Sequence, residues 1–332
     1  MPPTFQTEVT VDVHLGPDEL MGGMRRDALD GLGSRPRELP PTWFYDNVGC
    51  RLFDAITELE EYYPTRAERA ILVAHGDEIA KASQADTFIE LGSGTSDKTR
   101  HLLDAMLQLG QLERYVPFDV AEPTLRQAAE QLVNEYPGLA VHGVVGDFRH
   151  HLHLLPGQGR RMLAVLGGTI GNLQPDDRAA MLATLSDQMA PGDTLLIGTD
   201  LVKDPARLVL AYDDHAGVTA AFNRNVLVRL NRELGANFDL ARFEHVARFD
   251  EDHEWIEMRL RSLGDQEVTV GDLGLTFDLL DGETIRTEIS AKFRPEGWQA
   301  ESEAAGLELV SQWFDPAGDF CLSLSAKPEV SW

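Results

Sequence analysis

Strand and helix patterns alternate through the middle of the chain. Between residues 86 and 201, short apolar runs are followed by stretches in which apolar residues recur every three or four positions. The pattern predicts strands at 87–91, 115–120, 139–147, 161–167 and 193–200, and helices at 98–109, 122–135 and 178–189. Because parallel strands need crossover connections, this alternation predicts an α/β fold with a mostly parallel sheet.

The pattern changes on both sides of this region. Residues 21–83 are typical of helices interrupted by prolines, and residues 203–245 also have helical spacing. Within residues 253–290, apolar and polar positions alternate, which predicts antiparallel strands. Residues 307–313 and 320–326 flank a turn rich in Asp, Pro and Gly, and predict a closing antiparallel hairpin.

These changes predict two domains. We expect a core made of residues 67–201 and 293–332, and a second, α+β domain made of residues 1–66 and 202–292. We also expect the second domain to bind the substrate, in a pocket between the two, since pockets commonly form at domain boundaries.

Composition narrows the classes of partner. The 332 residues carry a formal net charge of −26, which disfavours nucleic acid and anionic membranes as partners. No apolar run approaches the roughly 18 residues of a membrane helix, and the N-terminus lacks the features of a signal peptide. The two cysteines, Cys50 and Cys321, match no metal spacing. We therefore expect a cytoplasmic protein, compatible with a monomer, that acts on a small molecule without a metal.

A glycine-rich turn follows the first strand of the α/β region, at Glu90–Ser96. The dinucleotide fingerprint needs a third glycine, where this chain has Asp97, so a pyrophosphate fits poorly. The E-x-G-x-G form that begins at Glu90 resembles the first motif of class I S-adenosylmethionine methyltransferases. That cofactor carries an ammonium and a sulfonium and no phosphate, so acidic groups around the loop suit it.

Two further acids end the next two strands. Asp119 can accept hydrogen bonds from both hydroxyls of a ribose, as acids do there in other doubly wound folds. Asp147, followed by Phe148, stands where class I methyltransferases hold the adenine. Each acid alone is more often a cap or a solvated turn residue, and the three together in strand order favour a methyltransferase. Lys98, at the start of the first helix, could pair with the cofactor carboxylate or be an ordinary surface lysine.

Longer motifs along nearly the whole chain, from about Leu20 to Ser325, resemble one family. They are Pro41–Asp46, Glu61–Arg66, Glu90–Ser96, Gly167–Asn172, Ala211–Asp214, Ala221–Asn225 and Thr287–Arg294. They look like the histidine-specific methyltransferase of ergothioneine biosynthesis. The resemblance implies trimethylation of the α-amino group of L-histidine to hercynine, with S-adenosylmethionine converted to S-adenosylhomocysteine.

The resemblance also implies roles for single residues. Asn172 and Tyr45 would be catalytic, with Asn172 accepting from the α-amine. Tyr62 and Tyr212 would hold the histidine carboxylate. Further residues would complete the two binding sites: Glu288 and Ser290 at the imidazole nitrogens, Tyr45 and Phe53 beside the ring, and Gly92, Lys98, Asp119, Asp147 and Phe148 at the cofactor.

The chemistry is consistent with these roles. Methyl transfer needs a neutral amine held in line, which an amide oxygen can orient without stabilising the ammonium form as a carboxylate would. Glu288 and Ser290, two apart on a strand, point to one face, and a buried carboxylate rejects ligands that leave it unpaired. Gly168 departs from the family pattern, in which we expect a serine, and this puts the local hydrogen bonding in question.

Other readings stay open at this stage. Taken singly, each tyrosine could be an ordinary half-buried residue, Glu288 could face solvent, and Asn172 could cap a turn. The histidines of the run His150–His153 lack a further ligand partner, so we expect them to be solvated rather than to bind metal. Alternative functions are methylation of another small amine, a non-catalytic S-adenosylmethionine sensor, and a protein methyltransferase.

Overall fold

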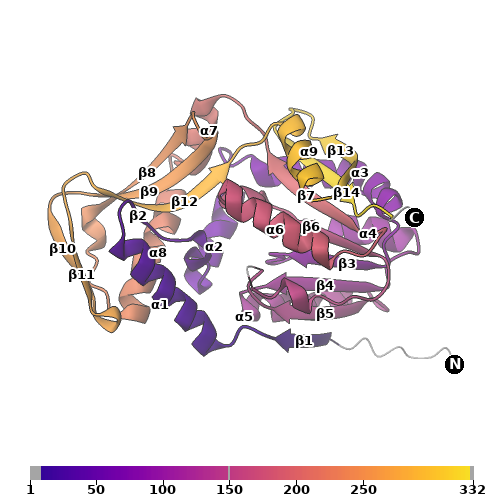
Figure 1. The fold of residues 1–332 in the computed structure, drawn as a ribbon, viewed down its shortest axis with the longest axis horizontal. Helices are drawn as coiled ribbons and strands as arrows, with labels where there is room; N and C mark the ends of the chain where they lie inside the picture. Colours follow the sequence, from indigo (N-terminus) through magenta and orange to yellow (C-terminus); the bar gives the residue numbers. More distant parts are fainter. Residues whose placement is uncertain (1–8, 149, 330–332) are drawn as a thin grey trace. The chain divides into compact units, whose positions relative to one another are not determined.

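The computed structural model describes residues 9–148 and 150–329 of the chain, which divide into two compact units (Figure 1). The described residues of unit 1 lie in Met1–Leu15, Pro64–Leu201 and Phe293–Trp332. Unit 2 consists of Gly16–Tyr63 and Val202–Lys292. Each unit has its own sheet.

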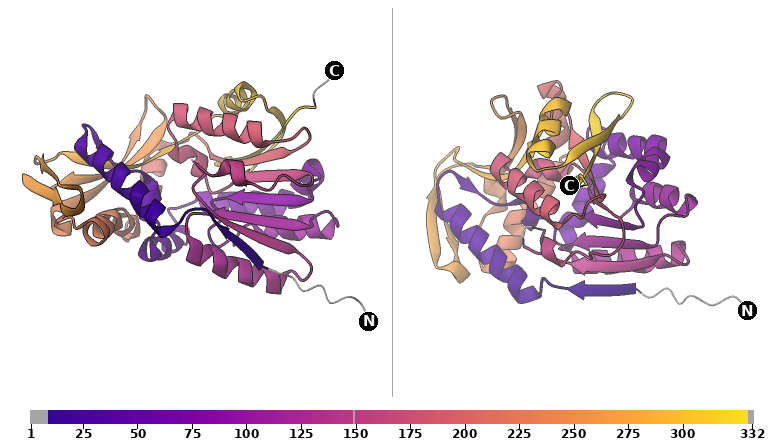
Figure 2. Two further views of the ribbon diagram at one scale, coloured as in Figure 1. Left: turned by 60° about the horizontal axis from the view of Figure 1, so that its bottom comes forward. Right: turned by 45° about the vertical axis from the view of Figure 1, so that its right-hand side comes forward.

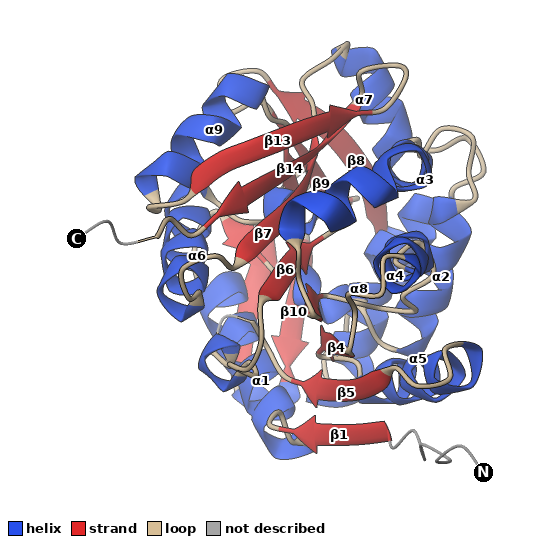
Figure 3. Ribbon diagram, turned by 90° about the vertical axis from the view of Figure 1, so that its right-hand side faces the viewer, coloured by secondary structure: helices blue, strands red, loops and turns tan. Residues whose placement is uncertain are grey.

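Unit 1 is built on an eight-stranded sheet in the order β1-β5-β4-β3-β6-β7-β14-β13, which Figure 3 shows from β13 at the top to β1 at the bottom. The strands are β1 (Val9–Val13), β3 (Thr87–Leu91), β4 (Arg114–Asp119), β5 (Ala140–Val145), β6 (Arg161–Val165), β7 (Thr194–Asp200), β13 (Glu308–Phe314) and β14 (Phe320–Ala326). The first six in spatial order are parallel, whereas β14 runs antiparallel to β7 and β13 antiparallel to β14. The chain order reverses beside β3, which places the ends of β3 and β6 at a topological switch point.

Helices cover both faces of this sheet, with α5 on one side and α6 and α9 on the other in the left panel of Figure 2. They are α3 (Pro64–Ser83), α4 (Arg100–Gln108), α5 (Glu122–Glu135), α6 (Pro175–Gln188) and α9 (Pro295–Ala304). Because both faces are covered, every residue of β3 and of β7 is buried. That burial explains why apolar residues predominate in these strands without the alternation of a half-exposed strand.

Unit 2 combines helices with a four-stranded sheet in the order β2-β12-β9-β8 and a separate pair, β10 and β11. Its helices are α1 (Pro17–Gly33), α2 (Asn47–Thr57), α7 (Pro205–Tyr212) and α8 (Val218–Leu234). Its strands are β2 (Arg37–Glu38), β8 (Phe243–Asp250), β9 (Trp255–Ser262), β10 (Gln266–Val270), β11 (Leu275–Leu279) and β12 (Thr284–Ala291). The pairing of β12 with β9 shifts register between Arg286 and Glu288, and such a bulge re-aims the side chains that follow it.

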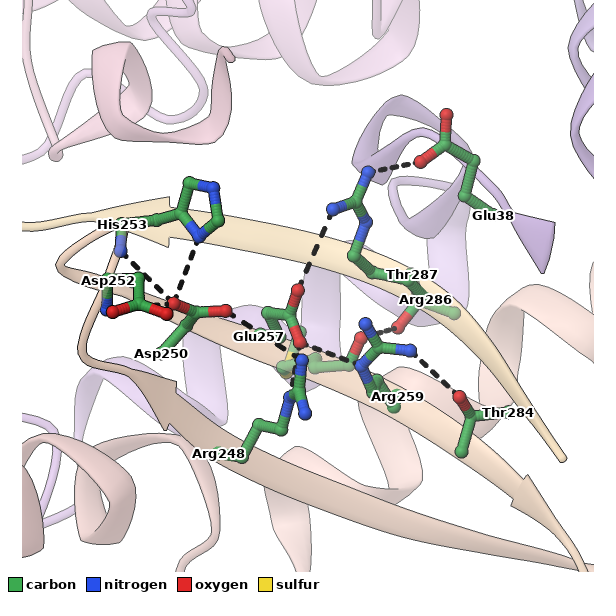
Figure 4. Close-up of polar contacts among 11 residues, drawn as sticks. Glu38, Arg248, Asp250, Asp252, His253, Glu257, Arg259, Thr284, Arg286 and Thr287 are labelled. Carbon is green, nitrogen blue, oxygen red and sulfur yellow. Dashed lines mark hydrogen bonds and ion pairs between the residues drawn. The ribbon is translucent and has the colours of Figure 1, made fainter. Parts of the chain in front are cut away.

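A buried carboxylate joins the strands of this sheet. Glu257 on β9 accepts hydrogen bonds from Arg248 on β8 and Arg259 on its own strand, and pairs with Arg286 on β12 (Figure 4). Burial alone would raise the pKa of Glu257, but the arginines outweigh it and lower this pKa to about 2. Arg286 also pairs with Glu38 of β2, so the ion pairs cross the whole sheet.

The expected α/β class and mostly parallel sheet are confirmed, and two segments differ from expectation. Residues 243–245 fall at the start of β8 instead of continuing a helix, because β8 pairs with β9 along its whole length. Residues 9–13, expected in the second domain, belong to unit 1, because β1 pairs in parallel with β5 and supplies an edge strand.

Candidate functional site

The glycine-rich loop after β3 has left-handed backbone where the sequence has glycine. Gly92 and Gly94 have φ of 73° and 51°, which glycine adopts without steric cost. The amides of Gly92 and Ser93 donate to the carbonyl oxygen of Phe118, which ties the loop to the end of β4. A Cβ placed at Gly92 or Gly94 would meet no atom within 4 Å, so the loop has open space over its glycines for a ligand.

Asp119 at the end of β4 supports this loop. Its two carboxylate oxygens accept hydrogen bonds from the amides of Gly94 and Ala121, each over 2.9 Å. Burial raises the pKa of Asp119, and these amides partly offset the rise. Each oxygen uses one lone pair on an amide, so the carboxylate can still accept from two ligand hydroxyls.

Asp147 follows β5 at the same edge of the sheet. It is buried, and its amide donates to Nδ1 of His151 over 3.0 Å. Phe148 beside it is half-buried. His151 is itself buried, which corrects the expectation of a solvated histidine run, whereas His150 and His153 are exposed. No group of three or more metal-ligating side chains occurs within residues 9–148 and 150–329.

Glu90, the acid of the loop motif, points away from the open side of the loop. Its carboxylate is buried and accepts from the hydroxyls of Thr99 and Tyr115 over 2.7 Å and 2.5 Å. Burial raises its pKa to about 7, against the effect of these two hydrogen bonds. Glu90 therefore ties the loop to β4 and to the residue before α4.

Lys98 has a partner that the sequence analysis missed. Its ammonium pairs with Glu68 of α3, a fully buried carboxylate. Glu68 also accepts from the amide of Gly167, over 2.8 Å and 3.0 Å to its two oxygens. One carboxylate thus joins the segment before α4 to the turn after β6. The contact depends on how α3 packs, and no local motif announces it.

The turn after β6 carries Asn172. Gly167 and Gly168 both have left-handed φ, of 77° and 69°, and the short 3-10 helix Thr169–Asn172 follows them. A serine at position 168 would be strained in this left-handed conformation, whereas glycine adopts it without a steric cost. This difference gives a physical reason for the departure from the family pattern. Asn172 ends the turn and is half-buried.

Unit 2 gathers four of the predicted aromatic residues. The ring of Tyr45 lies 5.7 Å from that of Phe53, and the ring of Tyr62 lies 6.2 Å from Phe53 and 6.1 Å from Tyr212. Phe222 of α8, which the sequence analysis did not single out, contacts Tyr45 and Phe53 at 5.7 Å and 5.9 Å. We call Tyr45, Phe53, Tyr62, Tyr212 and Phe222 the aromatic cluster.

Polar groups of β12 adjoin this cluster. The hydroxyl oxygens of Tyr212 and Ser290 are 2.7 Å apart, and Lys292 donates to both. Glu288 is half-buried, and burial raises its pKa to about 8 although the charge of Lys292 lowers it. Lys292, directly after the end of β12, was missed, yet it continues the two-residue spacing of Glu288 and Ser290, and that spacing could have revealed it.

The two units thus carry different chemistry. Unit 1 offers an open glycine loop with acids at the ends of two neighbouring strands, which suits a nucleoside-type cofactor. Unit 2 offers aromatic rings beside a carboxylate, two hydroxyls and an ammonium, which suits a small amino acid with a polar ring. No helix in the described part of the chain combines the length and apolar character that crossing a bilayer requires.

Comparison with known proteins gives consistent matches. A family profile described as "Histidine-specific methyltransferase, SAM-dependent" matches residues 24–327. The chain is 56% identical over 319 residues to histidine N-alpha-methyltransferase of Mycobacterium tuberculosis, covering 96% of this chain and 99% of that one. It is 55% identical over 314 residues to the protein of that name from Mycolicibacterium smegmatis, covering 95% and 98%. Ergothioneine biosynthesis protein 1 of Neurospora crassa is 32% identical over 304 residues, covering 90% of this chain and 34% of that protein.

Proposed function

Because this chain belongs to the family of histidine-specific, S-adenosylmethionine-dependent methyltransferases, we propose that it trimethylates the α-amino group of L-histidine. The product is hercynine, and three molecules of S-adenosylmethionine become S-adenosylhomocysteine. Hercynine formation is the step that the family contributes to ergothioneine biosynthesis. The proposal rests on the joining, in unit 2, of an aromatic cluster with Glu288, Ser290 and Lys292.

S-Adenosylmethionine supplies an electrophilic methyl carbon on a sulfonium, and unit 1 has the residues to bind it. Asp119 would accept from the ribose hydroxyls with the lone pairs that its two amide partners leave unused. Asp147 would accept from the adenine amine, with Phe148 against the base. The backbone at Gly92 would lie against the cofactor, and Lys98 would pair with its carboxylate.

The histidine would be held by its two ends. Tyr62 and Tyr212, whose rings are in contact, would donate to the carboxylate. Glu288 and Ser290 would bind the two imidazole nitrogens, and Tyr45 and Phe53 would pack beside the ring. This set separates histidine from phenylalanine, because an apolar ring would offer no hydrogen-bonding group to Glu288 and Ser290.

Asn172 would orient the amine. A nucleophilic amine must be neutral, and its lone pair must point at the methyl carbon. An amide oxygen accepts one N–H without the negative charge that would raise the pKa of the amine. The left-handed glycines before Asn172 shape the backbone turn that carries it.

We further propose that the protein works as a cytoplasmic monomer without a nucleic acid or membrane partner. The net charge of −26 supports the part of this proposal that concerns partners, since such a surface repels nucleic acid and anionic lipid. Sedimentation equilibrium of the purified chain tests the oligomeric state, and a dimer mass would contradict the monomer.

The function is tested by incubating the enzyme with S-adenosylmethionine and each of the common amino acids, followed by mass spectrometry. We expect a gain of three methyl groups on histidine alone. Methylation of the imidazole instead of the α-amine, which fragmentation distinguishes, would contradict the proposed acceptor. Methylation of another amino acid and not of histidine would contradict the substrate.

A further inference from the structure

The segment of unit 2 that carries Tyr45 is held by one face of α8. Tyr45 lies between the 3-10 helix Pro41–Phe44 and α2, and α8 packs against both of these elements (Figure 1). The residues of α8 that make the contacts are spaced three or four apart, and so lie on one face of the helix. They are Phe222, Asn225, Arg229 and Arg232.

Two of these residues hold the backbone before Tyr45. The guanidinium of Arg229 donates to the carbonyl oxygen of Trp43 over 3.2 Å and lies over the Trp43 ring, 5.5 Å from its centroid. The ring of Phe222 lies 4.6 Å from that of Phe44. The segment is therefore attached to α8 at its start.

Asp46 attaches the other end of the segment. Its Oδ1 accepts hydrogen bonds from the amides of Val48 and Gly49, over 3.1 Å and 2.8 Å, and so caps the first turn of α2. The same oxygen accepts from the side-chain amide of Asn225 over 2.8 Å, and Oδ2 accepts from Arg232 over 2.9 Å. One carboxylate thus joins the start of α2 to α8.

Gly49 makes this connection tight. A Cβ at this position would lie 1.7 Å from the carbonyl oxygen of Phe44, which itself accepts from the amide of Asp46 over 3.0 Å. Only glycine lets the first turn of α2 approach the preceding backbone so closely. The backbone on the two sides of Tyr45 is therefore in direct contact, and a shift at Asp46 would move Tyr45 with it.

The link to Asn225 is the stronger of the two that Asp46 makes with α8. Asn225 is buried and the Asp46 side chain is 10% exposed, so this charge-assisted hydrogen bond is shielded from water. Arg232 is 49% exposed and also pairs with Glu233, and exposed ion pairs contribute little. Burial alone would raise the pKa of Asp46, but the hydrogen bonds from Gly49 and the two α8 side chains outweigh it and lower this pKa.

We propose that Asp46 is a positioning residue for histidine binding, and that it acts through its link to Asn225. The link places Tyr45, which precedes Asp46, and Phe53, on the helix that Asp46 caps, in the aromatic cluster. Phe222, on the same face of α8 as Asn225, contacts both rings. These two rings are the ones that would pack beside the imidazole. This inference rests on the proposed function, because it concerns how the same site binds histidine.

Three variants separate the link from the helix cap. Asp46→Ser keeps a capping oxygen for α2, because serine is a preferred N-cap residue, but its side chain is too short to span to Asn225. Asn225→Ala keeps the cap and removes the link. Asp46→Asn keeps an oxygen that can accept from both Gly49 and Asn225, and loses only the charge that faces Arg232.

The test is steady-state kinetics of histidine methylation by the full chain. We expect KM for histidine to rise roughly tenfold in Asn225→Ala and in Asp46→Ser, because each loses a hydrogen bond to the carboxylate. The rings hold the substrate equally before and during methyl transfer, so kcat should stay within about twofold of wild type. In the double variant KM should rise no further than in either single one, since both remove the same hydrogen bond. Asp46→Asn should keep KM within about threefold of wild type.

The control is Asp239, which caps a 3-10 helix of the same unit by accepting from the amide of Ala241 over 3.1 Å. Asp239→Ser should leave KM and kcat as in the wild type. Calorimetry should give the wild-type affinity for S-adenosylhomocysteine in every variant, because the proposed cofactor residues belong to unit 1. If Asn225→Ala does not fold, Asp46→Ser carries the test, since it retains the cap.

The outcomes separate this inference from the proposed function. If the wild type trimethylates histidine and KM is unchanged in folded Asp46→Ser, Asp46 is only a helix cap and the inference fails. Effects on KM that add up in the double variant would also overturn it, because two independent contacts would then be responsible. A tenfold rise in Asp46→Asn would assign the effect to the ion pair with Arg232 and contradict the link to Asn225. Failure of the wild type to methylate histidine would overturn the proposed function and this inference together.

Discussion

His245 Nε2 donates a hydrogen bond to the backbone carbonyl oxygen of Tyr212 over 2.8 Å. Burial lowers the pKa of His245, so its ring is neutral. Its Nδ1 accepts a hydrogen bond from the side-chain amide nitrogen of Asn223, also over 2.8 Å. The oxygen of Asn223 in turn accepts from the hydroxyl of Thr287 over 2.7 Å. This relay connects β12, next to Glu288, with the end of α7 at Tyr212, and it holds together two parts of the proposed substrate site.

The relay predicts the effect of Thr287→Val. The change keeps the shape of the side chain but leaves the buried oxygen of Asn223 without its donor, which costs ~1–3 kcal/mol of unfolding free energy. Because Tyr212 is less firmly held, KM for histidine should rise severalfold. Urea unfolding and steady-state kinetics measure the two effects. Thr184→Val, at an exposed helical position, is the control and should stay within about 0.5 kcal/mol of wild type. Equal stability of the two variants would contradict the relay.

Glu288 predicts a pH-dependent stability. Its pKa in the folded protein is about 8, above the ordinary value of 4.5. Between these values the folded protein keeps a proton on Glu288 that the unfolded chain releases. The stabilisation of the folded state by this proton is fully present below pH 4.5 and is lost as the pH rises through 8. Glu288→Gln has no carboxyl to titrate and so cannot lose this stabilisation. The melting temperature of the variant minus that of the wild type should therefore increase from pH 4.5 to pH 8. The variant should also bind histidine weakly and S-adenosylhomocysteine normally.

The control for this prediction is Glu267→Gln, at an exposed position on β10 of the same unit. Its melting temperature should follow that of the wild type at every pH. A constant difference between Glu288→Gln and wild type across the interval would show that Glu288 titrates normally in the folded protein. Unchanged histidine affinity in Glu288→Gln would remove the specificity role.

Asn172 predicts a loss of rate with little loss of cofactor binding. In Asn172→Ala the amine loses the acceptor that aims its lone pair, and misorientation of this kind costs about 10²-fold in kcat. Asn172→Asp keeps an acceptor but stabilises the ammonium, so its rate should recover as pH rises. Single-turnover kinetics and calorimetry of S-adenosylhomocysteine binding separate these effects. Asn134→Ala, at an exposed position in α5, is the control, and a normal rate in Asn172→Ala would exclude the orienting role.

The sequence predicts best those features that local pattern determines. The strands β3 and β7 are buried on both faces, so their apolar runs identify them without any knowledge of their neighbours. The glycine-rich loop is also local, since Gly92 and Gly94 adopt left-handed backbone. The edge strand β1 is only partly buried and carries a weak pattern, so its pairing with β5 was not predicted.

Contacts made by packing between distant segments could not be predicted in this way. Glu68 is one position in a long helix, and only the packing of α3 brings it to Lys98 and Gly167. Glu90 matches its motif, yet the motif does not reveal that its carboxylate turns toward Tyr115. For Lys292 the spacing with Glu288 and Ser290 was visible, but its hydrogen bonds to the hydroxyls of Tyr212 and Ser290 need the three-dimensional structure.

Glu68 and Lys98 give the last prediction, which concerns the proposed role of Lys98 at the cofactor. Glu68→Gln leaves the ammonium of Lys98 without its charged partner, and Lys98→Met leaves a buried carboxylate without a cation, so each should destabilise unit 1. The double variant removes both charges and should be more stable than the sum of the single losses predicts.

If Lys98 also pairs with the cofactor carboxylate, Lys98→Met should weaken S-adenosylmethionine binding roughly tenfold even in the Glu68→Gln background. Asp77→Asn, at an exposed position on the same helix, is the control. Equal cofactor affinity in Glu68→Gln and in the double variant would mean that Lys98 only pairs with Glu68, and that the cofactor carboxylate is bound by other groups.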